Sequence, residues 1–314
     1  MEVISMPMWA WILFYALVIV MLYADLKLFG RKGQHEVSIS EALKMTAVWI
    51  IVSLIFCGGI WFYEGDNKAM EFLAGYLIEK SLSMDNLFVF LMLFSFFGVQ
   101  RKYQHEVLFW GIFGALILRS IFIFAGAAMV QRFEWILGIF GVFLIYTGIK
   151  MFNHQEESVD PSKNIFVKLF KKFFPVTDQM HEDKFFVVEQ GKRLATPLFI
   201  ALLVIETTDV AFAVDSIPAV FSVSRDPFIV LTSNIFAILG LRALYFALAA
   251  IAQYFAYLKY GLGIILSFVG VKMLLEVLWD INIPTPISLL IIFGVLVLSM
   301  LASYVATLYS RRRQ

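Results

Sequence analysis

Two stretches place charged residues inside otherwise apolar sequence, and these are the residues that could carry chemistry. They are LIEKSLSMDNLFVF at 77–90 and VIETTDVAFAVDSIPAVF at 204–221, which contain Glu79, Lys80, Asp85, Glu206, Asp209 and Asp215. A charged side chain at the centre of a bilayer costs about 2.5 to 3.5 kcal/mol unless it has partners. Such groups therefore mark either an ion or proton pathway or a structural ion pair.

The available ligand atoms favour a hard divalent cation. Carboxylates, asparagine amides and hydroxyls supply oxygen, which suits Mg²⁺, Ca²⁺ or Mn²⁺, and the sequence leaves the choice among these open. All four histidines fall in loops or at segment ends and Cys57 is the only cysteine, so a zinc or copper site, a disulfide and a CxxC pair are not expected. The candidate metal ligands are Glu79, Asp85, Asn86, Glu206, Asp209 and Asp215. No tightly bound cofactor and no catalytic motif are expected, which argues against an enzyme.

The composition indicates that these residues are positioned by membrane-spanning helices. Hydrophobic residues make up 61% of the 314 positions, charged residues only 16%, and the net charge of +1 gives no reason to expect a nucleic-acid partner. Apolar runs predict about nine spans in an all-α polytopic membrane protein. They lie near 7–28, 43–63, 70–98, 106–129, 134–152, 195–223, 227–250, 256–279 and 284–308. The first is expected to be a retained helix, and the distribution of Lys and Arg predicts an outside N-terminus and a cytoplasmic C-terminus.

The charged residues recur in a common register. When Asp85 is aligned with Asp215, Glu79 falls on Asp209, because each acid lies six residues upstream. Farther along, Arg119 and Lys150 in the first copy match Arg242 and Lys272 in the second, with spacings of 31 and 30 residues. Two copies of three helices would have opposite orientations, an architecture in which substrate sites form near the bilayer midplane.

This repeat predicts the organisation of the chain. The expected units are two N-terminal helices (1–66), a first three-helix repeat (67–152), a cytoplasmic loop (153–194), a second repeat (195–280), and a final helix with a basic tail (281–314). Pro218 removes a backbone donor, so a kink or unwound turn is expected around Asp215.

A structural interpretation competes with the metal-binding one. The bases Lys80, Arg119, Arg242 and Lys272 could neutralise the acids as ion pairs. We expect this role for the two arginines, because a fixed guanidinium is a good partner for a carboxylate and a poor neighbour for a metal ion. Glu79 and Glu206 are candidate proton carriers, since a buried carboxyl group beside other acids can hold a proton.

The long loop at 153–194 contains KNIFVKLFKKFF, whose apolar residues and lysines would occupy opposite sides of a helix ended by Pro175. We expect this helix to lie in the inner membrane interface against anionic lipid. A regulatory or docking surface for a protein partner is the alternative.

The stretches EKSLSMDN, ETTDVAFAVDSIPAVF and DPFIVLTSNIFAILGLRALYF resemble the signature segments of the TerC family, and the layout with a central loop is similar to its Alx-like branch. Over nearly the whole chain, the resemblance implies a multi-pass protein of the bacterial inner membrane, related to exporters with three-plus-three helix repeats. It also implies an association with Mn²⁺ export and tellurite resistance. The residues that match the family's acidic segments are Glu79, Asp85 and Asn86 in the first and Glu206, Asp209, Asp215 and Ser216 in the second.

Together these observations predict a manganese exporter that works by alternating access, with Asp85, Asp209 and Asp215 as principal ligands. Its partners would be the bilayer and the metal ion. Two other classes stay open: a non-transporting scaffold in a stress or redox response, which would act through the loop, and a protein that handles the tellurite oxyanion through Arg119 and Arg242. The third is disfavoured because the intramembrane acids would repel an anion.

Overall fold

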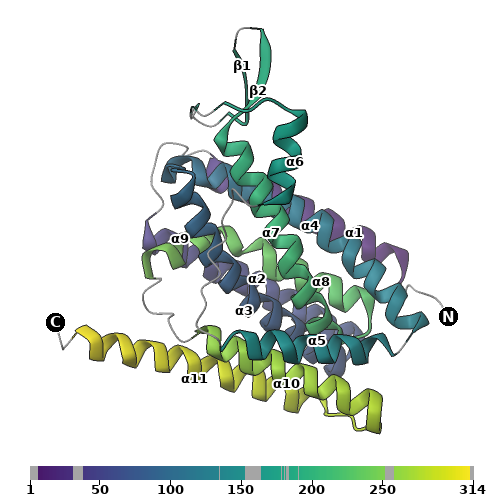
Figure 1. Ribbon diagram of the computed structural model, residues 1–314. Coiled ribbons are helices and arrows are strands. Elements are labelled where there is room, and N and C mark those ends of the chain that lie inside the picture. The colour runs from purple at the N-terminus through teal and green to yellow at the C-terminus, as the bar shows by residue number, and fades with distance from the viewer. Residues whose placement is uncertain are drawn as a thin grey trace.

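Helices make up most of the chain, and a β-hairpin projects from one end of the bundle (Figure 1). The computed structural model describes residues 6–30, 38–133, 135–152, 164–177, 179, 181, 184–189, 191–251 and 258–311. Its helices are α1 (Met8–Gly30), α2 (Ile39–Glu64), α3 (Asp66–Phe96), α4 (Arg101–Arg132), α5 (Ile136–Lys150), α6 (Ile165–Phe173), α7 (Pro197–Phe221), α8 (Pro227–Leu239), α9 (Leu241–Ile251), α10 (Leu258–Trp279) and α11 (Thr285–Arg311). The strands β1 (Phe186–Glu189) and β2 (Lys192–Ala195) pair antiparallel.

The predicted all-α polytopic membrane protein is confirmed, but fewer helices than expected meet the requirements of a span. Within the described residues six helices are long and apolar enough to cross a bilayer, or seven if α8 and α9 form one bent span. Two predicted spans do not meet these requirements. The apolar run of α3 is interrupted by Glu79, Lys80 and Asp85, and α5 has only 15 residues. Helices therefore lie at the predicted positions, but the number of nine spans is not confirmed.

The expected unwound turn in the second acidic stretch is wrong. Helix α7 continues through Asp215 and Pro218 to Phe221. Pro218 has no N–H to donate to the carbonyl of Val214, so α7 lacks one internal hydrogen bond there, but the helix continues for three residues beyond the proline. The break lies instead at Gly240, where α8 and α9 meet at 41°. An isolated glycine in the apolar run IFAILGLRALYF was the only local signal for it.

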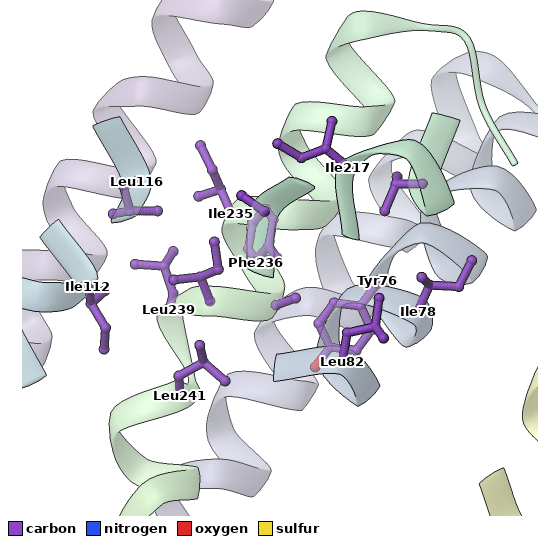
Figure 2. Close-up of a cluster of buried hydrophobic side chains, with 14 of the residues drawn as sticks. Tyr76, Ile78, Leu82, Ile112, Leu116, Ile217, Ile235, Phe236, Leu239 and Leu241 are labelled. Carbon is purple, nitrogen blue, oxygen red and sulfur yellow. The ribbon is translucent and has the colours of Figure 1, made fainter. Parts of the chain in front are cut away.

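Helix α8 forms the centre of the bundle, and all of its residues are buried. It packs against α3, while α7 packs against α4. Figure 2 shows part of the resulting core, in which Ile235 and Phe236 of α8 lie among side chains that include Leu116 of α4 and Tyr76 of α3. The two helices that carry the acidic stretches, α3 and α7, are therefore held against one buried framework.

Glycines bring the backbones of α5 and α10 into direct contact, and these helices run side by side in Figure 1. A Cβ atom at Gly141 would lie 2.9 Å from the carbonyl oxygen of Gly270, and one at Gly270 would lie 2.5 Å from that of Gly141. About two helical turns away, Gly148 and Gly263 make the same reciprocal approach. An added Cβ at either one would lie 2.6 or 2.8 Å from the carbonyl oxygen of the other. Small residues that allow close backbone approach are a common basis of helix association in membranes.

The segment between the two halves of the bundle forms a small module on the end of α7. Helix α6 and the hairpin pack around Phe199 in the first turn of α7, which contacts the rings of Phe170 and Phe186 at centroid distances of 5.1 and 4.6 Å. The hairpin turn includes Gly191 at φ +75°, a conformation that favours glycine. The sequence predicted α6 but not this hairpin.

The glycine contacts generate a prediction about stability. Replacing Gly270 by alanine should lower the thermal stability of the detergent-solubilised protein, at a cost of about 1 to 3 kcal/mol, because the methyl group would overlap backbone that cannot move aside. Gly148→Ala should behave similarly. Gly294→Ala in α11 is the matched control, because nothing lies within 4 Å of its added Cβ. Equal melting temperatures for Gly270→Ala and Gly294→Ala would contradict this account of the α5–α10 contact.

Candidate functional site

A buried arginine lies between the acidic stretches of the two halves. Arg119 of α4 donates from Nε and Nη2 to the two carboxylate oxygens of Asp209, at 3.2 and 2.9 Å, and pairs through Nη1 with Glu79. The same Nη1 lies 3.2 Å from Ser216 Oγ and 3.4 Å from Asn234 Oδ1. Arg119, Glu79 and Asp209 are all buried. One guanidinium thus joins α3, α4, α7 and α8.

The chemistry of this cluster follows from its charge count. Two carboxylates face one guanidinium, and the buried Lys80 also lies within electrostatic range of Glu79, so the acids of this cluster are matched by basic side chains. Ser83 donates to Glu79 Oε1 at 2.9 Å, while no described residue offers a hydrogen bond to the buried Glu79 Oε2. The bidentate contact with Asp209 uses the planar geometry that only arginine provides.

A cavity lined by both polar and apolar side chains lies beside the Arg119 cluster. It has a volume of about 120 Å³ and is lined by Leu82 and Asn86 of α3, Thr147 and Met151 at the end of α5, Phe212, Asp215 and Ser216 of α7, and Leu266 of α10. Thr147 Oγ1 donates to Asp215 Oδ1 at 3.3 Å. Because one water takes up about 30 Å³ in the liquid, the cavity has room for an ion that keeps part of its hydration shell. Ser216 belongs to both the cavity and the Arg119 cluster.

The predicted ligands are divided among different environments. Glu79 and Asp209 face Arg119, whereas Asn86 and Asp215 face the cavity. Asp85 lies on α3 next to Asn86, but its side chain falls outside the described part of the structure. Among the described residues, no three acidic, histidine or cysteine side chains lie together as a metal-binding group. The six candidates therefore do not form one ligand shell in this conformation, because a guanidinium occupies the place between Glu79 and Asp209.

Glu206 lies against α4, within electrostatic range of Asp209. A Cβ atom at Gly114 would overlap its carboxylate, so glycine at this position leaves the space that the acid fills. Glu206 Oε2 is buried, and no hydrogen-bond donor from the described residues reaches it.

The other three predicted ion-pair residues have separate partners. Arg242 pairs with Asp25 of α1 at 2.7 Å and also donates to the Asp25 carbonyl oxygen at 2.6 Å, so its acid comes from outside the repeat. The buried Lys80 donates to the carbonyl oxygen of Ala237 at 3.0 Å, where α8 ends at the break. Lys272 lies within electrostatic range of Glu276 and Glu71. The sequence analysis missed Thr147 in the cavity, since one hydroxyl in an apolar run carries no signal.

These features define an integral membrane protein with a charged core and a cavity between its helices. The family model described as "Integral membrane protein TerC family" matches residues 64–313. The chain therefore belongs to the TerC family, as its acidic stretches predicted.

Relatives align over almost their whole lengths. The chain is 48% identical over 295 residues to "Uncharacterized membrane protein STKORF319" of Myxococcus xanthus, covering 94% of this chain and 92% of that protein. It is 46% identical over 310 residues to "Putative membrane-bound redox modulator Alx" of Escherichia coli K12, covering 96% and 95%. It is 40% identical over 296 residues to a membrane protein of Rickettsia bellii, covering 94% and 97%. No solved structure matches the chain.

The Arg119 cluster generates a second prediction. Arg119→Gln should destabilise the protein by about 3 to 5 kcal/mol, because it leaves buried carboxylates without their counter-charge. Arg225→Gln is the control: its pair with Glu276 is partly exposed and should contribute about 0 to 1 kcal/mol. Thermal unfolding in detergent measures both.

A compensating variant tests the cause. Adding Asp209→Asn to Arg119→Gln should recover part of the lost stability, because it removes one uncompensated charge. If Arg119→Gln is as stable as the parent and changes metal preference instead, the structural role of this arginine is wrong.

Proposed function

We propose that this protein exports Mn²⁺ across the bacterial inner membrane and that the ion binds in the cavity beside Asp215. The observation that supports this most directly is that aligned positions of both copies line the cavity. In the register that matches Asp85 with Asp215, Leu82 corresponds to Phe212 and Asn86 to Ser216, and each of these four contributes to the wall. A carboxylate, an amide and two hydroxyls form an oxygen set of the kind that Mn²⁺ accepts.

The proposed ligand set is narrower than the one predicted from the sequence. Asp215, Asn86, Thr147 and Ser216 supply the oxygens that face the cavity, and Asp85 is retained as a ligand candidate on its neighbouring position of α3. Glu79 and Asp209 instead hold Arg119. Glu206, whose buried Oε2 receives no hydrogen bond from the described residues, is the better candidate proton carrier.

Alternating access requires two halves that can move against each other, and the packing supports an inverted repeat. Counted from the matched Lys150 and Lys272, Gly141 corresponds to Gly263 and Gly148 to Gly270. Exchanging the copies converts the contact of Gly141 with Gly270 into that of Gly263 with Gly148, and both contacts occur. An approximate two-fold axis through the α5–α10 crossing would produce this pattern. Such an axis is typical of transporters built from inverted repeats.

The orientation follows from charge and the arrangement of the ends. We propose an N-terminus outside and a C-terminus in the cytoplasm, which leaves most Lys and Arg inside. The start of α1 and the end of α11 lie at opposite sides of the bundle in Figure 1, in agreement with an odd number of crossings. The α6 and hairpin module would then lie on the cytoplasmic side.

A non-transporting role in stress or redox response remains the alternative. The relatives named as redox modulators are the reason to consider it. Thiol exchange within this chain does not support it, because Cys57 is the only cysteine. A redox effect would follow indirectly from metal movement. Flux in proteoliposomes that contain only this protein separates the two classes, since a scaffold moves no ion.

The third prediction concerns Asp215. Asp215→Asn should abolish Mn²⁺ flux into vesicles while leaving expression and folding intact, because it is nearly isosteric and removes a charge from a helix in the membrane. Thr147→Val should weaken transport by about 10- to 100-fold by removing the hydroxyl that contacts Asp215, whereas Thr147→Ser should preserve it. Normal flux in Asp215→Asn would remove this acid from the mechanism.

The fourth prediction concerns selectivity and pH. Mn²⁺ should bind in the presence of excess Mg²⁺, which holds its waters tightly, and Zn²⁺ should gain little where no histidine or thiolate lines the cavity. Protons and metal compete for the same carboxylate oxygens, so affinity should fall as the pH is lowered toward the pKa of the carboxylates. A competition titration at several pH values measures this. Binding that is indifferent to pH, or a preference for Zn²⁺ by orders of magnitude, would exclude the proposed site.

A further inference from the structure

Helix α6 has an apolar face that the rest of the protein does not cover. Ile165, Phe166, Leu169 and Phe173 are exposed, with Ile165 and Phe173 at 73% and 77%. At 100° per residue these four side chains fall within an arc of about 100°. An exposed apolar stripe of this kind marks an interaction site.

The remaining two faces of α6 have different roles. Val167 is buried, and the ring of Phe170 packs against the ring of Phe199 of α7, so one face attaches the helix to the bundle. Lys168, Lys171 and Lys172 are exposed on the third face, within an arc of about 100° that borders the apolar stripe. The sequence placed Phe170 together with the exposed apolar residues, whereas the structure assigns it to the packing contact.

We propose that α6 docks on the anionic surface of the bilayer that surrounds the protein, inserting its exposed apolar stripe while its lysines contact acidic lipid headgroups. Side chains of this kind on adjoining faces are typical of helices that lie in the interface, and a negative leaflet attracts the lysines. A neutral apolar protein partner would not use the basic face. The proposal rests on the cytoplasmic placement of α6 given above but not on metal transport.

The docked helix would be connected directly to the helix of the site. Asn164 accepts hydrogen bonds from the backbone N–H groups of Phe166 and Val167 at 2.9 and 3.2 Å, which caps α6, and its Nδ2 donates to Thr207 Oγ1 at 2.9 Å. Thr207 lies next to Glu206 and two residues before Asp209. One amide therefore holds both the start of α6 and the acidic segment of α7, so lipid contact at α6 reaches α7 through Asn164.

A spin label at position 169 tests the docking. In a Cys57→Ser background, Leu169→Cys in the full-length protein is labelled and reconstituted into neutral phosphatidylcholine vesicles or vesicles that also contain anionic phosphatidylglycerol. We expect accessibility to an aqueous relaxation agent to fall several-fold in the anionic vesicles. A label at Val188→Cys on the hairpin, where the native side chain is 72% exposed, should stay accessible in both.

Charge variants identify the surface responsible. Replacing Lys168, Lys171 and Lys172 by Gln should remove the lipid dependence, whereas the same change in charge on the hairpin module, at Lys184, Lys192 and Arg193, should preserve it. A label at 169 that is equally accessible in both vesicles would overturn the proposal. Dependence that is lost only in the hairpin variant would also overturn it, by moving the docking surface to the hairpin.

Hydrogen exchange tests the connection to α7. Anionic vesicles should slow backbone exchange around Thr207 in the parent, and Thr207→Val should abolish this effect while the label at 169 still inserts, because Asn164 continues to cap α6. Exchange around Thr207 that does not respond to the lipid in the parent would exclude the connection. None of these measurements depends on Mn²⁺ movement, so they stand or fall separately from the proposed transport.

Discussion

The buried contact of Arg119 with Glu79 and Asp209 is the constraint on which the rest of the structure depends. A guanidinium in the centre of an apolar bundle is stable only where carboxylates offset its charge, and its two acids come from different halves of the chain. Satisfying it fixes α3, α4 and α7 relative to one another and brings Ser216 and Asn234 to the same point. The cavity beside Asp215 adjoins this cluster, because Ser216 contributes to both.

In the proposed mechanism of alternating access, the same contact would have to change between conformations. Glu79 and Asp209 occupy matching positions of the two copies, so an arginine from only one copy makes the centre asymmetric. Its equivalent, Arg242, is directed to Asp25 on α1 and does not compete for these acids. In a mechanism of alternating access, movement of one half against the other would have to shift the Arg119 contacts, and an ion near Ser216 is placed to influence that shift.

Much of this could be predicted from the sequence, for identifiable reasons. The long apolar runs predict where the helices lie. The repeat in the sequence matches Glu79 with Asp209 as equivalent acids. The partition of the acids could not be predicted, because which carboxylate faces Arg119 depends on helix rotation and packing. The sequence also placed an unwound turn near Pro218, whereas α7 is continuous there and the bend occurs at Gly240. The absence of a Cβ at Gly240 leaves room for Lys80, which donates to the carbonyl of Ala237.

The central claim is that the transported ion binds in the cavity beside Asp215, while Arg119 stays between Glu79 and Asp209 and pairs with both. Anomalous diffraction from crystals grown with Mn²⁺, recorded on both sides of the manganese absorption edge, tests this claim most directly. The account predicts one strong peak within about 2 to 2.6 Å of an Asp215 oxygen, with the Arg119 ion pairs intact. A peak between Glu79 and Asp209, with the guanidinium displaced, would contradict it.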